Sequence, residues 1–170
     1  MIKILFVCHG NICRSPMAEF VMKDIVRKNH LAKDFHIESR ATTEDEICNG
    51  EGSPIYEPAL SELKKHKIFN EESKDDILSK RAILLTEDDF YNFNYIIGMD
   101  QENLRYINRI KPEDSKAEVH LLRDFTEEKG YVSDPWYTRD FEKAYNDIYN
   151  GCKGFFSFLE WFLLRCSGIT

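Results

Sequence analysis

Hydrophobic residues gather in short, dense runs at two places along the chain. Residues 3–8 (KILFVC) and 95–99 (YIIGM) are rich in branched side chains, which is typical of strands that are covered on both faces. Residues 35–41 and 117–122 alternate between hydrophobic and polar positions and are predicted as two further strands. The pattern therefore gives four candidate strands.

Hydrophobic residues at helical spacing lie between and after these runs. Helices are predicted over 16–30, after a Ser-Pro start, over 55–68 and over 100–109. A last helix is predicted over 138–166, with one apolar face made by Phe141, Ala144, Ile148, Cys152, Phe155, Leu159, Phe162 and Cys166. A second stripe on this helix is interpreted as additional core, in preference to a patch for another subunit, and consists of Phe158, Trp161 and Leu164. Strands that alternate with helices predict an α/β fold.

Composition narrows the class of protein. The 170 residues are 42% hydrophobic and 31% charged, which indicates one globular domain over 1–170, with the polar stretch 70–82 as the candidate mobile surface segment. A net charge of -7 argues against nucleic-acid binding. The apolar run 155–164 is half of the roughly 20 residues that span a bilayer, so no membrane association is expected. Five cysteines without a secretory signal or zinc-ligand spacing favour the cytoplasm.

The loop from Cys8 to Ser15 lies directly between a predicted strand and a predicted helix. Ligands of open α/β sheets bind at such junctions. We expect Ser15 to be the N-cap and Pro16 to lie in the first turn, so that backbone amides point inward and bind an oxyanion. Gly10 and Asn11 are expected to supply a tight loop with positive φ.

Cysteine and arginine in this loop fit phosphate chemistry. Amides, the helix dipole and a guanidinium favour thiolate over thiol, so Cys8 is the candidate nucleophile. The planar fork of Arg14 can hold two phosphate oxygens. Asp134, in SDPWYTRDFE, is the candidate acid for the leaving group, and Trp136 with Tyr137 offers an aromatic wall. The spacing of Cys8 and Arg14 alone is weak evidence for a phosphate site. The strand before the loop and the Ser-Pro pair after it make this interpretation stronger.

Four segments resemble the low-molecular-weight protein tyrosine phosphatase family, in the same order: residues 7–19 (VCHGNICRSPMAE), SRAT at 39–42, YIIGMDQENL at 95–104 and DPWY at 134–137. The resemblance implies a Rossmann-like domain of three layers, with a four-stranded parallel sheet flanked by helices. It also implies that no metal and no cofactor are required. The implied reaction is hydrolysis of phosphotyrosine monoesters, in proteins or small aryl phosphates, through a cysteinyl-phosphate intermediate.

The same resemblance implies a role for each matching residue. Cys8 would be the nucleophile, Arg14 the phosphate clamp, and Asp134 the acid of the first step and the base of the second. Ser39 would support the loop, and the hydroxyl of Ser15 would assist departure of the thiolate. The residues implied or expected to bind substrate and phosphate are His9, Gly10, Asn11, Ile12, Cys13, Ser15, Trp136 and Tyr137. Cys13 would either form a reversible disulfide with an oxidised Cys8 or pack as a small buried residue.

The chain also departs from the family pattern. His9 replaces a common Leu and either contacts a substrate carboxylate or faces solvent. The sequence TEDEI at 43–47 predicts an acidic wall opposite Trp136, from Glu44, Asp45 or Glu46, and therefore poor use of acidic phosphopeptides. Lys80, after an insertion at 70–79, stands where the family has a loop-supporting His and leaves the partner of Asn11 open. Ile12, in place of the Thr of relatives that prefer phosphoarginine, favours a phenyl ring.

Two alternative functions remain at this point. An arsenate reductase on the same fold needs further cysteines to carry the disulfide outward, and Cys48, Cys152 and Cys166 are not closely spaced. A catalytically silent phosphotyrosine-binding module has no need for a nucleophile and an acid together. The five histidines show no metal-ligand spacing. The sequence leaves the oligomeric state open between a monomer and a weak dimer.

Overall fold

The computed structural model describes the backbone of residues 1–166 and the side chains of residues 1–161. Its centre is a parallel sheet with the strand order β2-β1-β5-β6. These strands are β1 (Ile2–Cys8), β2 (Phe35–Ala41), β5 (Tyr95–Gly98) and β6 (Glu118–Leu121). The four predicted strands and their parallel arrangement are thereby confirmed.

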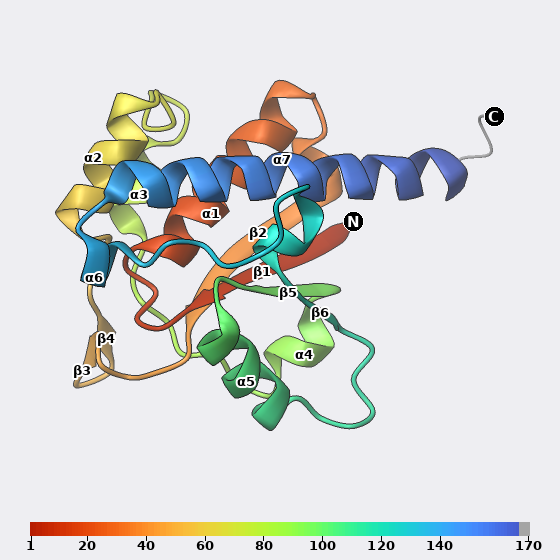
Figure 1. Ribbon diagram of the computed structural model, residues 1–170, viewed down its shortest axis with the longest axis horizontal. Coiled ribbons are helices and arrows are strands. Elements are labelled where there is room, and N and C mark those ends of the chain that lie inside the picture. Colours follow the sequence, from red (N-terminus) through yellow and green to blue (C-terminus); the bar gives the residue numbers. More distant parts are fainter. Residues whose placement is uncertain (167–170) are drawn as a thin grey trace.

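Helices cover both faces of this sheet, which gives three layers (Figure 1). The helices are α1 (Arg14–Lys28), α2 (Glu57–Lys65), α3 (Lys74–Ser79), α4 (Asp89–Asn92), α5 (Gln101–Ile110), α6 (Pro135–Thr138) and α7 (Phe141–Cys166), with short 3-10 turns η1 (Ala32–Asp34) and η2 (Leu122–Phe125). A small antiparallel hairpin, β3 (Ile47–Cys48) and β4 (Glu51–Gly52), lies apart from the main sheet. The predicted α/β class is confirmed.

The alternation of side chains along β1 explains why its sequence is hydrophobic throughout. Ile4 and Phe6 belong to the core beneath α1 and α7, whereas Leu5 and Val7 belong to the core beneath α4 and α5. Side chains on a strand alternate between the two faces, so a strand covered twice has no solvent-exposed position. Burying each such side chain contributes about 1.5–3 kcal/mol.

Several predicted boundaries differ from the observed ones. Helix α1 begins at Arg14, with Cys13 as its N-cap, so Ser15 is not the N-cap. Pro16 lies in the first turn, as expected. The stretch 70–82, predicted as a mobile surface segment, contains α3, whose Ile77 is 2% exposed and packs in the core.

The long C-terminal helix begins at Phe141 and ends at Cys166. Members of its predicted apolar face pack in the core: Phe141 partly, and fully Ala144, Ile148, Cys152, Phe155 and Leu159. Phe158 of the second stripe packs against Phe125. Trp161 is 51% exposed, so its assignment to the core was wrong. The side chains of Phe162, Leu164 and Cys166 lie outside the described residues.

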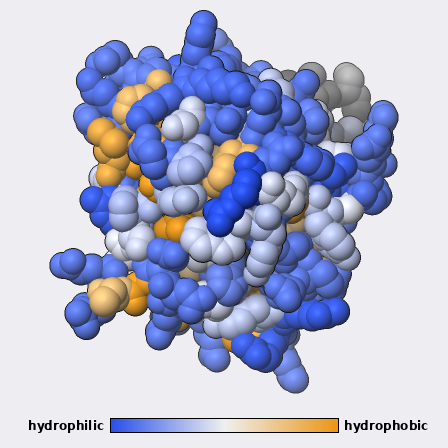
Figure 2. All heavy atoms as spheres, turned by 60° about the vertical axis from the view of Figure 1, so that its left-hand side comes forward, coloured by the Kyte–Doolittle hydropathy of each residue, from blue (hydrophilic) through white to orange (hydrophobic). Residues whose placement is uncertain are grey.

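The surface is largely hydrophilic on the side that carries α2, α6 and the β3–β4 hairpin (Figures 1 and 2). Hydrophobic residues form small, separate patches on this face (Figure 2). Within the described part of the chain, no helix has both the length and the apolar character that crossing a membrane requires.

Close packing of α7 against η2 predicts a stability effect. A Cβ atom at Gly154 would lie 2.0 Å from the main-chain oxygen of Phe125. We therefore expect Gly154→Ala to lower the free energy of unfolding by about 1–3 kcal/mol, despite the better helix propensity of alanine. Differential scanning calorimetry should show a thermal midpoint that is lower by at least roughly 3 °C. The matched control Lys153→Ala, at an exposed neighbouring position, should leave the midpoint nearly unchanged, and an equal shift in both variants would contradict the packing argument.

Candidate active site

The loop between β1 and α1 curls around the carboxyl end of β1. Asn11 has φ 57°, the left-handed conformation that asparagine tolerates better than most residues. The expectation of positive φ at Gly10 was wrong, because Gly10 is not among the positive-φ residues. A side chain at Gly10 would instead meet Glu46, whose Cγ lies 2.9 Å from the position of a Cβ atom. Glycine at this position therefore leaves room for the side chain of Glu46, which would have to shift if a Cβ atom were present.

A cavity of about 210 Å³ opens above this loop, lined by Cys8, His9, Gly10, Ile12, Cys13, Arg14, Asp45, Glu46, Asp100, Glu102, Asn103, Asp134, Trp136 and Tyr137. It therefore brings together the three predicted catalytic residues and most of the predicted binding residues. Asn11, Ser15 and Ser39 are buried and do not line it. Their side chains meet on the buried side of the loop, where Asn11 contacts both serines.

The guanidinium of Arg14 is held between two carboxylates. Its side chain is 4% exposed, Nη1 lies 2.6 Å from Oδ2 of Asp100, and Nη2 lies 2.6 Å from Oδ2 of Asp134. Burial disfavours the charge of Arg14, but Cys8, Asp134 and Asp100 outweigh burial and raise its pKa. Arg14 is therefore a fixed cation at the base of the cavity.

Asp100 is a site residue that the sequence analysis missed. Its Oδ1 accepts a hydrogen bond of 2.9 Å from the amide of Asn103, so that Asp100 caps α5 while its Oδ2 binds Arg14. A signal was available, because Asp100 follows β5 and β5 lies beside β1 in a parallel sheet. The carboxyl ends of neighbouring parallel strands meet at one edge, where ligands bind.

Asp134 has the same double role on the other side of Arg14. Its Oδ1 accepts from the amide of Trp136 at 2.9 Å and caps α6, while its Oδ2 binds Arg14. Both carboxylates thus use one oxygen to cap a helix and the other to orient the guanidinium. The predicted acid and the predicted clamp are in direct contact.

The nucleophile candidate has a hydroxyl neighbour on the buried side. Sγ of Cys8 lies 3.0 Å from Oγ of Ser15. The side-chain amide of Asn11 donates to Oγ of Ser15 at 2.9 Å and to Oγ of Ser39 at 2.8 Å, and its oxygen accepts from the amide of Ile83 at 3.1 Å. The sequence analysis left the partner of Asn11 open, and the structure gives its side chain three partners: Ser15, Ser39 and the backbone amide of Ile83.

The remaining cysteines differ from Cys8 in environment. Burial, reinforced by Cys8 and Asp134, raises the pKa of Cys13 to about 12, so that Cys13 is a protonated thiol at neutral pH. Cys48 lies exposed on β3, and Cys152 is buried in the core. Neither of these lines the cavity, and the side chain of Cys166 lies outside the described residues.

Acidic residues form part of the rim of the cavity. Asp45 and Glu46 line it from the β2–β3 loop and Glu102 from α5, whereas Glu44 is not part of the lining. His9 faces solvent and its Nε2 lies 2.6 Å from Oδ2 of Asp45, a contact that lowers the pKa of Asp45. Among the residues whose side chains are described, Arg14 and His9 are the basic ones that line this cavity.

The aromatic side of the cavity comes from α6. Trp136 and Tyr137 line the mouth and are both exposed. The ring of Tyr56 lies 5.8 Å from that of Trp136, and the amide of Tyr56 donates to the carbonyl oxygen of Ile12 at 2.9 Å. Tyr56, which the sequence analysis did not single out, therefore connects the aromatic wall to the loop.

Comparisons with known proteins agree with this geometry. The family model for low molecular weight phosphotyrosine protein phosphatase matches residues 3–161. The low molecular weight phosphotyrosine protein phosphatase of Gallus gallus is 37% identical over 157 residues, which are 89% of this chain and 92% of that protein. The crystal structure of SP-PTP, the low molecular weight protein tyrosine phosphatase of Streptococcus pyogenes, is similar with a TM-score of 0.78 and 40% identity, covering 94% of this chain and 93% of that one. The chain therefore belongs to the low molecular weight phosphotyrosine protein phosphatase family.

Proposed function

We propose that this protein hydrolyses phosphotyrosine monoesters in two steps, through a cysteinyl-phosphate on Cys8. The observation that carries the proposal is the meeting of Cys8, Arg14 and Asp134 in one cavity of about 210 Å³. We place the reaction in the cytoplasm, because the nucleophile must remain a free thiol and Cys8 is unpaired. Its substrates would be phosphotyrosine proteins or small aryl phosphates.

In the first step, the sulfur of Cys8 attacks phosphorus and the bond from phosphorus to the phenolic oxygen breaks. Arg14 holds two of the phosphate oxygens with its planar fork. Asp134 gives its proton to the departing phenolic oxygen. Entry of the phosphate must therefore release Asp134 from Arg14, where its Oδ2 now lies 2.6 Å from Nη2.

In the second step, water attacks phosphorus and the bond from sulfur to phosphorus breaks. Asp134 takes a proton from the water and inorganic phosphate is released. Cys8 leaves as a thiolate, and the hydroxyl of Ser15, 3.0 Å away, can donate a hydrogen bond to it. Arg14 stabilises the same developing charge in both steps.

The walls of the cavity favour an aromatic leaving group. Ile12 gives an apolar surface on the loop, and Trp136 and Tyr137 provide aromatic rings at the mouth. Aromatic rings pack favourably against a phenyl ring, in offset or edge-to-face geometry. We therefore assign phosphotyrosine, in preference to phosphoserine or phosphoarginine, as the substrate.

Removal of the nucleophile should separate turnover from binding. We expect Cys8→Ser to lower the release of phosphate from p-nitrophenyl phosphate to background, because serine is a poor nucleophile at neutral pH and the protonated Cys13 cannot replace Cys8. Isothermal titration should still detect inorganic phosphate bound to Arg14. Cys48→Ser, which changes an exposed cysteine outside the cavity, serves as the control and should retain turnover. Turnover of Cys8→Ser near the wild-type rate would refute the covalent route.

The role of Asp134 can be tested by comparing substrates with poor and good leaving groups. We expect Asp134→Ala to slow phenyl phosphate by about 10²–10⁴-fold and p-nitrophenyl phosphate far less, because a poor leaving group depends on the proton. Steady-state kinetics with both substrates checks this. Asp114→Ala, which removes a carboxylate that contacts Tyr91 away from the cavity, should change neither rate. Equal slowing of both substrates by Asp134→Ala would remove its role as acid.

The acidic residues of the rim predict a preference among peptides. At low ionic strength we expect kcat/KM for a phosphotyrosine peptide flanked by lysines to exceed that of the same peptide flanked by glutamates by roughly three- to tenfold. The ratio should shrink in about 1 M salt, where charges on a surface are screened. Asp45→Asn should reduce the ratio and Glu118→Gln, on strand β6 outside the cavity, should not. An equal or higher kcat/KM for the acidic peptide would contradict this prediction.

A further inference from the structure

The chain that leads to Asp134 is attached to α7 by a carboxylate outside the cavity. Asp147, on α7, has a side chain that is 12% exposed, and its Oδ2 accepts a hydrogen bond of 3.0 Å from the main-chain amide of Ser133. Ser133 directly precedes Asp134, the proposed acid. The connection from η2 to α6, which carries both residues, runs along α7 (Figure 1). Asp147 does not line the cavity, so it reaches Asp134 only through the backbone.

Arg123 connects the same carboxylate to the beginning of the segment 128–133. Its Nη1 lies 3.3 Å from Oδ1 of Asp147 and donates to the main-chain oxygen of Tyr131 at 3.4 Å. Its Nη2 donates to the main-chain oxygen of Glu128 at 2.9 Å. A guanidinium carries five N–H donors in one rigid plane, so it can bind two carbonyl oxygens and a carboxylate together. Asp147 thereby orients the group that closes the turn 128–131.

Two glycines bring Asp147 and Arg123 within reach of each other. Asp147, Gly151 and Gly154 are spaced by four and then three residues, so they lie on one face of α7. A Cβ atom at Gly151 would lie 2.5 Å from an atom of η2, and one at Gly154 would lie 2.0 Å from another. The short helix η2, which contains Arg123, therefore packs directly on the backbone of α7. Asp147 lies one turn before this contact.

The proposed reaction requires Asp134 to leave Arg14 without leaving the cavity. Oδ2 of Asp134 lies 2.6 Å from Nη2 of Arg14, and the substrate phosphate has to displace it. The chain after Asp134 gives little restraint, because α6 has 4 residues and its last three are exposed. A displacement of about 1 Å in a reacting group can cost roughly 10²-fold in rate. The restraint on Asp134 must therefore come mainly from the residues before it.

Two successive main-chain amides provide this restraint. The amide of Val132 donates to the main-chain oxygen of Met99 at 2.9 Å, and the amide of Ser133 donates to Asp147. The first contact attaches the segment to the end of β5, and the second attaches it to α7. A hydrogen bond to an ionised acceptor is roughly twice as strong as one between neutral groups. The contact with Asp147 is also the one that lies nearest to Asp134 in the chain.

We propose that Asp147 is a positioning residue for Asp134, which holds the amide of Ser133 so that the carboxyl group released from Arg14 stays within reach of the leaving oxygen. The inference rests on the proposed function of the cavity. It assigns to α7 a part in proton transfer, in addition to its part in the core. The phosphate clamp is not involved, because Asp147 contacts Arg123 and not Arg14.

Two substrates with different leaving groups test this role. The ratio of their kcat/KM values does not depend on the fraction of folded enzyme, so a general loss of stability leaves it unchanged. We expect Asp147→Ala to lower kcat/KM about tenfold for phenyl phosphate and less than about threefold for p-nitrophenyl phosphate, whose leaving group depends less on the proton. The inhibition constant of inorganic phosphate should change by less than about twofold. Equal slowing of both substrates, or no slowing, would overturn the proposal.

A double-mutant cycle shows whether Asp147 acts through Asp134. In an Asp134→Ala background, Asp147→Ala should lower kcat/KM for phenyl phosphate by less than about twofold, since the acid is already absent. Asp147→Asn, which keeps an acceptor oxygen for the amide of Ser133, should retain most of the wild-type rate. An equal loss from Asp147→Ala in the two backgrounds would contradict the assigned role.

Lys143→Met is the matched control. Nζ of Lys143 lies 3.3 Å from Oδ2 of Asp147 on the same helix, and its side chain is exposed. The substitution leaves the hydrogen bond from Ser133 to Asp147 in place, so we expect kcat/KM to change by less than about twofold for either substrate. A loss as large as that of Asp147→Ala would count against the proposal. If Asp147→Ala shows no cooperative thermal transition, Arg123→Met/Asp147→Ala, which removes both charges of the pair, is judged by the same criteria.

A readout that is independent of phosphatase activity separates this inference from the proposed function. Hydrogen exchange at the amide of Ser133, followed by NMR, reports the contact with Asp147 directly. Exchange should be at least about tenfold faster in Asp147→Ala and unchanged in Lys143→Met. Unchanged exchange in Asp147→Ala would refute the inference. A wild-type protein without turnover would refute the proposed function, while the exchange rates still decide whether Asp147 holds the segment 128–133.

Discussion

The buried guanidinium of Arg14 is the constraint on which the rest of the site depends. A cation that is 4% exposed has lost most of its hydration and must be matched by negative charge. Asp100 and Asp134 supply this charge, each at 2.6 Å. The three residues come from three different segments: Arg14 opens α1, Asp100 caps α5 and Asp134 caps α6. Compensation of one charge therefore fixes the relative position of three loops at the carboxyl edge of the sheet, and the cavity is the space that they enclose.

The loop around Cys8 is fixed from its buried side by a different kind of interaction. Asn11 adopts φ 57°, a conformation that the surroundings must hold in place. Its side-chain amide has both donor hydrogens and its oxygen engaged, by Ser15, Ser39 and Ile83. A buried polar network of this kind rigidifies a site when every member has a partner, and it is costly when one is missing. The ion pair of Glu19 and Lys80 completes the network at its far end. The sulfur of Cys8 thus lies between an open cavity lined by Arg14 and a closed network that ends at Ser15.

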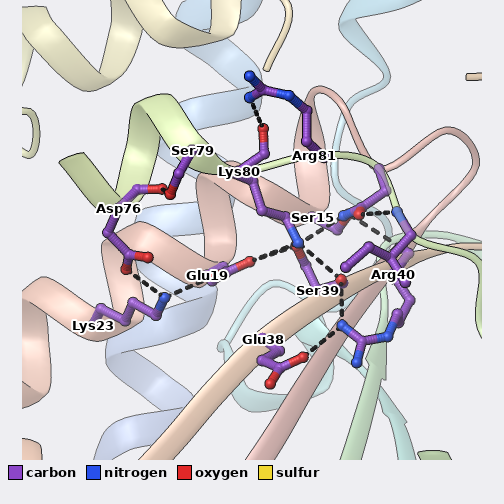
Figure 3. A network of polar contacts seen from close by, with 12 residues as sticks. Ser15, Glu19, Lys23, Glu38, Ser39, Arg40, Asp76, Ser79, Lys80 and Arg81 are labelled. Carbon is purple, nitrogen blue, oxygen red and sulfur yellow. Dashed lines mark hydrogen bonds and ion pairs between the residues drawn. The ribbon is translucent and has the colours of Figure 1, made fainter. Parts of the chain in front are cut away.

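The sequence was sufficient for those features that depend on local pattern and on general rules of sheet topology. The dense hydrophobic run of β1 predicted a central strand, and its junction with α1 located Cys8 and Arg14. Features that depend on tertiary contacts were missed or misassigned. Ser15 was taken as an N-cap from its residue type, but its hydroxyl is engaged by Asn11 and lies beside Cys8 instead. Glu19 follows a helical pattern in which a charged residue ordinarily faces solvent, but Lys23 on the same helix and Ser39 and Lys80 from distant segments surround its buried carboxylate (Figure 3).

The geometry also distinguishes which of the two carboxylates around Arg14 can serve as the acid. Asp100 caps α5, a helix of 10 residues whose Ile107 packs in the core, so movement of Asp100 would disturb a packed element. Asp134 caps α6, which has 4 residues and carries Trp136 and Tyr137 at the mouth of the cavity. An aryl phosphate that enters would contact these rings and Arg14 at the same time. In the proposed reaction, the phosphate would replace the carboxylate of Asp134 at Nη2 and leave Asp134 free to face the leaving group. Under the proposed mechanism, substrate binding would thereby be coupled to release of Asp134, because both depend on the same guanidinium.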